Sequence, residues 1–88
     1  IWKLRMSKLT PLKHFLRDQV QAALKHYFHT LEDENCKGLY DLVLSEVEMP
    51  LLKMMMQHTK GNQSRAAACL GISRSTLKKL LIKYDLEP

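Results

Sequence analysis

The chain has 88 residues, of which 45% are hydrophobic, and its formal net charge is +5. This length permits one domain with a single small core, which buries apolar surface only marginally, so oligomerisation is expected. No apolar run approaches the roughly 20 residues that span a bilayer, and the N-terminal residues lack the apolar core of a secretory signal, which together predict a cytoplasmic protein without membrane contact.

Residues 11–31 are predicted to form the first long helix, with Thr10 as its N-cap and Pro11 at its first position. The apolar residues of this segment return to one face over several turns, as a bundle helix requires, and they are Leu12, Leu16, Val20, Ala23, Leu24, Tyr27, Phe28 and Leu31. Residues 1–10 are expected to be a flexible N-terminal arm. His26 and His29 share a helix face, but they lack nearby Cys or carboxylate partners and are better interpreted as surface histidines than as zinc ligands.

The second long helix is predicted from Lys37 or Gly38 to His58, and it contains Pro50. The apolar pattern keeps its phase on both sides of the proline, which favours one kinked helix over two helices in series. The three methionines at positions 54–56 fit core filling better than a surface for partner peptides. Residues 11–58 of two chains are therefore expected to form the core of an intertwined homodimer.

Residues 59–88 are predicted to form a helix-turn-helix, in which two short helices flank Gly71. Two apolar stripes at helical spacing support this prediction, one of Ala66, Ala67 and Leu70 and another of Leu77, Leu80, Leu81 and Tyr84. Gly71 suits a left-handed C-terminal cap of the first helix, and Ser73 suits the N-cap of the second. The fold class is thus all-α, with four helices in each chain.

Cysteine usage and motif content predict neither a metal site, a cofactor nor an enzyme. Cys36 and Cys69 have no metal-ligand spacing, and Cys69 is expected to be a buried apolar filler beside Leu70. The sequence has no nucleophile–base pair and no glycine loop that would cradle a phosphate. An adaptor role, in which the methionine-rich helix binds a partner and the basic unit binds an acidic protein, is an alternative at this point.

The charge distribution indicates a polyanion partner for the C-terminal segment. Residues 1–31, 32–58 and 59–88 carry net charges of +5, −4 and +4. Lys and Arg that neutralise phosphates release condensed counterions, and this release generates affinity for double-stranded DNA. The second helix of a helix-turn-helix enters the major groove with its N-terminal residues nearest the base edges, so Arg74 is the first candidate for base readout.

Other polar residues of the unit are candidates for contacts with the phosphate backbone. An exposed helix start binds anions through its free N–H groups, and lysine or hydroxyl side chains on the outward side of the second helix reach phosphate oxygens. The candidates are Asn62, Ser64 and Arg65 at the first helix, and Thr76 and Lys79 with Lys78 or Lys83 on the second.

Several segments of the chain resemble the bacterial Fis family (factor for inversion stimulation). They are residues 39–52, residues 58–67 and Tyr84, together with residues 16–18 and 23–28. The likeness covers about residues 16–84 and includes the proline-containing helix as well as the helix-turn-helix. A similar unit ends the sigma-54-dependent enhancer-binding activators, so the C-terminal DNA-binding module of such an activator is the alternative.

The resemblance implies a homodimer that binds and bends DNA, is associated with the nucleoid and regulates transcription. By position it places Arg74 and Ser73 near base edges, with Ser73 where the family frequently has asparagine. The backbone contacts that it implies are Lys60, Asn62, Ser64, Arg65, Thr76 and Lys79. The two recognition helices of the family are closer together than successive major grooves of straight DNA, so the site bends and an A/T-rich centre is favoured. Contacts with a recombinase or with RNA polymerase are further expectations.

Overall fold

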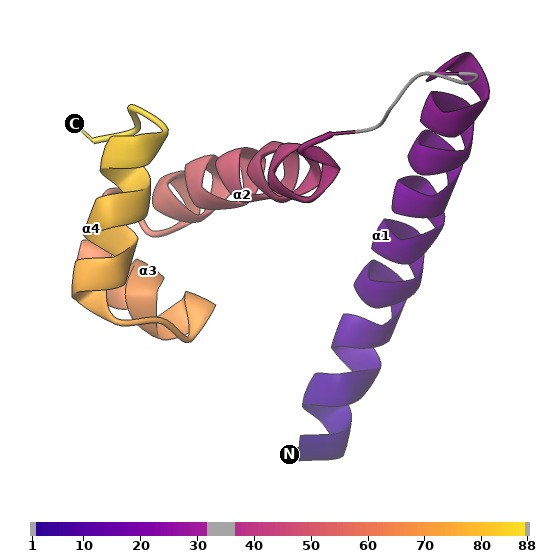
Figure 1. Ribbon diagram of the computed structural model, residues 1–88. Coiled ribbons are helices and arrows are strands. Elements are labelled where there is room, and N and C mark those ends of the chain that lie inside the picture. Colours follow the sequence, from indigo (N-terminus) through magenta and orange to yellow (C-terminus); the bar gives the residue numbers. More distant parts are fainter. Residues whose placement is uncertain (1, 32–36, 88) are drawn as a thin grey trace. The chain divides into compact units, whose positions relative to one another are not determined.

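The computed structural model describes residues 2–31 and 37–87, which are α-helical with connecting turns and contain no strand (Figure 1). Four helices follow one another in these ranges: α1 (Trp2–Leu31), α2 (Leu39–His58), α3 (Gln63–Leu70) and α4 (Arg74–Lys83). The predicted all-α class is therefore confirmed. The chain divides into two compact units, Ile1–Lys37 with α1 and Gly38–Pro88 with the other three helices. In the described part of the chain, no helix combines the length and apolarity that crossing a membrane requires.

Helix α1 begins at Trp2 rather than at Pro11, so the predicted start of this helix is wrong. Pro11 lies inside the helix, where its missing N–H removes one backbone hydrogen bond. The residues before a proline can still be helical when their own propensity is high, and Lys, Leu, Arg and Met at positions 3–6 all favour a helix. The flexibility expected of residues 1–10 stays a prediction.

Helix α2 runs through Pro50 as a single element. Its N-cap is Gly38, which has a left-handed backbone with φ of 69° and offers no side chain for capping. The carbonyl of Gly38 accepts the first helical bond from the N–H of Leu42, at 3.0 Å. The kink expected at Pro50 stays a prediction.

The core of the α2–α4 unit is small and lies between all three helices. Its buried members are Leu52 of α2, Ala66 and Ala67 of α3, and Leu77 and Leu81 of α4. The two alanines are small enough for α3 to approach its neighbours closely, which a larger side chain at either position would prevent. Partly buried side chains surround this core, namely Met55, Met56, Leu70, Ile72, Leu80, Tyr84 and Leu86. Core filling is thus confirmed for two of the three consecutive methionines, whereas Met54 is 63% exposed.

The three helices of this unit end in the same hydrogen-bonded turn, the Schellman motif. After α3, the N–H of Ile72 donates to the carbonyl of Ala67 at 3.1 Å, and Gly71 between them has φ of 76°. This confirms Gly71 as the left-handed cap. The ends of α2 and α4 repeat the pattern with Lys60 and Asp85, both at φ of 55°. Their closing bonds run from Gly61 to Met56 at 2.9 Å and from Leu86 to Leu81 at 2.8 Å.

Replacing Lys60 by glycine is expected to raise the free energy of unfolding by about 1 kcal/mol, because the left-handed backbone is costly for a residue with a Cβ. Urea denaturation at one fixed protein concentration measures the change. Lys53→Gly is the matched control, since Lys53 is exposed inside α2. The control is expected to lose about 1 kcal/mol. A loss of similar size at position 60 would contradict the prediction.

Candidate nucleic-acid interface

Side-chain caps fix the starts of α3 and α4. Asn62 Oδ1 accepts a hydrogen bond from the N–H of Arg65 at 3.1 Å, and Ser73 Oγ accepts one from the N–H of Thr76 at 3.1 Å. Both capping residues have extended backbones, which is the usual conformation at this position. The predicted capping roles of Asn62 and Ser73 are therefore confirmed. These caps hold Arg65 and Arg74 in the first turns of α3 and α4.

Hydroxyl groups cluster at the start of α4. Ser73 Oγ donates to Thr76 Oγ1 at 2.8 Å, and Ser75 Oγ lies 3.2 Å from Ser73 Oγ. The hydroxyl hydrogen of Ser73 is thus used within the helix, whereas Thr76 still has its own hydroxyl hydrogen to donate. A base contact in which Ser73 donates its hydroxyl hydrogen would have to replace its bond to Thr76 Oγ1. The geometry therefore favours Arg74 over Ser73 for reading a base edge.

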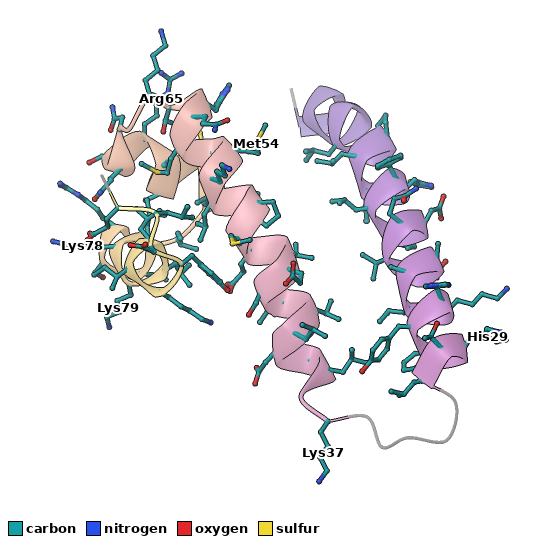
Figure 2. All side chains as sticks on the ribbon, turned by 90° about the horizontal axis from the view of Figure 1, so that it is seen from above. His29, Lys37, Met54, Arg65, Lys78 and Lys79 are labelled. Carbon is teal, nitrogen blue, oxygen red and sulfur yellow. The ribbon has the colours of Figure 1, made fainter. Side chains whose placement is uncertain are left out.

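All nine residues that the sequence assigns to DNA contact are exposed. They occupy the turn after α2, the first turn of α3 and the length of α4, and they are Lys60, Asn62, Ser64, Arg65, Ser73, Arg74, Thr76, Lys79 and Lys83. Figure 2 shows Arg65, Lys78 and Lys79 projecting outward from α3 and α4. Lys78 was an alternative to Lys83 on sequence grounds, and the structure exposes both. The arrangement presents exposed positive charge and hydroxyl groups on two adjoining helices.

The cationic side chains of this surface have no acidic partner among residues 2–31 and 37–87. Among the described residues, the one side-chain interaction of a lysine on this surface is with an aromatic ring, since Lys83 Nζ lies 5.2 Å from the centroid of the Tyr84 ring. Such a cation–π contact contributes about 0.5 to 1 kcal/mol at an exposed site and leaves the charge in place. The surface can therefore neutralise phosphates without first breaking an ion pair.

Tyr84 and Glu48 form a contact that sequence reasoning missed. Tyr84 was assigned only to the apolar stripe of α4, and its ring does pack against the core. Its hydroxyl, however, donates to Glu48 Oε1 on α2 at 2.5 Å. The two residues are 36 positions apart, so no local spacing pattern relates them. Only the packing of α4 near α2 brings them together.

The structure corrects one expectation about cysteine. Cys69 is exposed and not buried, because it lies beside the face of α3 that carries Ala66 and Ala67 into the core. A residue next to Leu70 is turned by about 100° around the helix axis, and this takes the thiol into solvent. Cys36 lies outside the described residues. Within residues 2–31 and 37–87, no three His, Cys, Asp or Glu side chains are grouped so that they could hold a metal ion.

Comparison with known proteins identifies the family. Residues 43–84 match the family model described as bacterial regulatory protein, Fis family. The DNA-binding proteins Fis of Actinobacillus succinogenes, Escherichia coli O1:K1 and Yersinia pestis are each 56% identical over 71 residues, which cover 81% of this chain and 72% of each relative. The chain belongs to the Fis family. The resemblance seen in the sequence is thus confirmed, and the chain is a member of a family of regulatory proteins and not an enzyme.

The match to the Fis family model covers the whole candidate interface. It runs from within α2 to Tyr84, the C-cap of α4, and contains all nine candidate contact residues. It also contains the buried residues that pack α2, α3 and α4 together. Both the surface and the scaffold that presents it therefore fall within the family pattern.

Proposed function

We propose that the chain is a homodimeric regulator that binds and bends double-stranded DNA, and that it acts in nucleoid organisation and transcription regulation in the bacterial cytoplasm. The observation that carries the proposal is the exposed set of cationic and hydroxyl side chains on α3 and α4, whose cations have no acidic partner among the described residues. Relatives that share 56% of the aligned residues are named DNA-binding proteins, which supports the same role here.

Arg74 is the base-reading residue in this proposal. It is the first residue of α4, it is exposed, and the cap at Ser73 fixes the helix start beside it. A guanidinium group at that position can donate two parallel hydrogen bonds to O6 and N7 of guanine in the major groove. Ser73 is a second base-proximal group, limited by its bond to Thr76.

The remaining candidates hold the phosphate backbone. Lysine and arginine supply charge, the hydroxyls of Ser64 and Thr76 supply donors, and free N–H groups at the start of α3 add an anion site. These contacts set affinity and register but carry little sequence information. The residues are Lys60, Asn62, Ser64, Arg65, Thr76, Lys79 and Lys83.

Exposed apolar side chains on α1 and α2 support a homodimer. Phe15 is 63% exposed, Leu12 55% and Met54 63%, and several other leucines on both helices are also exposed. A small chain gains little stability from apolar groups left in water, so a second copy that covers them would supply the missing burial. The dimer would also fix the distance between the two copies of α4, and through that distance the bend of the DNA. Contacts with a recombinase or with RNA polymerase stay predictions of the family resemblance.

Binding to duplexes that differ only in their central base pairs tests this function. We expect about tenfold tighter binding, with a larger bend, when the centre is A/T-rich, because such a centre narrows its minor groove at lower cost. The logarithm of the binding constant should fall linearly with the logarithm of salt concentration, by about 0.9 for each neutralised phosphate. Titrations over a salt series, with bending followed in the same samples, measure both quantities.

Two other results of this experiment have distinct meanings. Equal affinity for both centres with no bend would contradict shape readout while leaving DNA binding intact. Negligible binding to any duplex at physiological salt would contradict the DNA-binding role and favour the adaptor alternative.

A further inference from the structure

Tyr84 connects the last turn of α4 to α2. It is the C-cap residue of α4, it is partly buried, and its ring packs against the core. Its hydroxyl donates to Glu48 Oε1, so one end of the ring is fixed by packing and the other by a charge-assisted hydrogen bond. A tyrosine held at both ends has few rotamers left to sample.

The same ring lies under a candidate phosphate-binding group. Lys83 Nζ is 5.2 Å from the centroid of the Tyr84 ring. A lysine side chain normally loses much conformational freedom when it binds a phosphate. A cation already held over a fixed ring has lost part of that freedom before binding, which strengthens the later contact.

We infer that Tyr84 and Glu48 are positioning residues for DNA binding: the Glu48–Tyr84 hydrogen bond fixes the ring, and the ring holds the Lys83 ammonium group where it meets a phosphate. The inference rests on the proposed function and deepens it, because neither Tyr84 nor Glu48 is assigned a contact with DNA. It also connects α2, the helix expected in the dimer core, to the phosphate-binding end of α4. A change at Glu48 thus reaches the DNA through Lys83.

Tyr84→Phe tests the inference, because it removes the hydroxyl and keeps the ring. We expect about fivefold weaker binding to an A/T-centred duplex. The salt slope should also become shallower, as one phosphate contact in each protomer loses occupancy. The decisive measurement is a double-mutant cycle: in a Lys83→Ala background, Tyr84→Phe should cause no further loss of affinity. Titrations are made well below the thermal unfolding midpoint of each variant.

Two matched variants control for charge and for loss of a hydroxyl elsewhere. Glu48→Gln removes the negative charge but keeps a side-chain oxygen that accepts the Tyr84 hydroxyl, so its salt slope should equal that of the wild type. Tyr40→Phe removes the hydroxyl of a tyrosine that is 76% exposed and should bind like the wild type. An unchanged salt slope in Tyr84→Phe would overturn the inference, as would a loss of affinity that adds fully to the loss caused by Lys83→Ala. In either case, DNA binding by the wild type would leave the proposed function standing. A wild-type chain that does not bind DNA would instead overturn the proposed function.

Discussion

Replacing Leu77 by alanine is expected to lower the free energy of unfolding by about 2 to 5 kcal/mol, which is the usual cost of emptying a buried leucine site. Leu77 is 0% exposed and, with Leu81, is one of the two largest fully buried side chains in the described chain. It packs in a core that has only four other buried hydrophobic members among the described residues, so few neighbours can relax into the space. Small domains have total stabilities of about 5 to 15 kcal/mol, and the variant should therefore be largely unfolded at elevated temperature.

Urea denaturation followed by circular dichroism, at one fixed protein concentration, measures this loss. Ile82→Ala is the matched control because Ile82 lies on the same helix, has a similar volume and is 57% exposed. Its loss should be within about 0.5 kcal/mol, as for most surface substitutions. Comparable losses at positions 77 and 82 would show that α4 does not pack through the face that carries Leu77.

The starts of α3 and α4 and the end of α3 follow from the sequence because their signals are local. Asn62 and Ser73 place an oxygen where it accepts from a backbone N–H three residues later, and Gly71 takes the left-handed conformation at little cost. Each of these effects depends on a few neighbouring residues and not on the rest of the fold. Cap residues at the right spacing therefore predict these boundaries correctly.

The start of α1 and the left-handed turns after α2 and α4 are less accessible to such reasoning, although the apolar pattern correctly predicted that α2 ends at His58. Pro11 is permitted at the first position of a helix, but it does not stop helix formation by the residues before it. Lys60 and Asp85 take the left-handed position where glycine is usual, so the residue type gives no signal. After each of these left-handed residues, the N–H of the following residue, Gly61 or Leu86, closes the turn by donating to a carbonyl in the last turn of the helix.

The side chains at and near the candidate interface also divide into those whose exposure or contacts the sequence predicts and those that require the tertiary structure. Charge and residue type were sufficient to select Arg65, Arg74 and Lys79, all of which are exposed. Residue type did not predict the orientation of Cys69, because a shift of one position around α3 separates core from solvent. The Glu48–Tyr84 bond required the tertiary arrangement of α2 and α4, since periodicity describes each helix alone.

Arg74→Ala is expected to weaken binding to a preferred duplex by about 10-fold to 100-fold, since a bidentate contact to guanine contributes about 1 to 3 kcal/mol of discrimination. The physical reason is that alanine supplies neither of the two donors that read O6 and N7. Sequence preference should relax at the base pair that Arg74 reads, while affinity for unrelated duplexes changes little. Competition titrations with duplexes substituted at single positions, at fixed salt, measure both effects.

Two further substitutions separate base readout from charge. Arg74→Lys keeps the positive charge but loses the planar pair of donors, so it should lose most of the specificity and little of the non-specific affinity. Lys79→Ala should weaken binding to all duplexes alike and make the salt slope shallower by about 1 for each protomer. If Arg74→Ala behaved like Lys79→Ala, Arg74 would be a backbone contact, and sequence preference would have to come from DNA shape alone. The N-cap of α4 argues against that result, because Ser73 fixes the helix start beside Arg74 while Lys79 lies more than a turn further along.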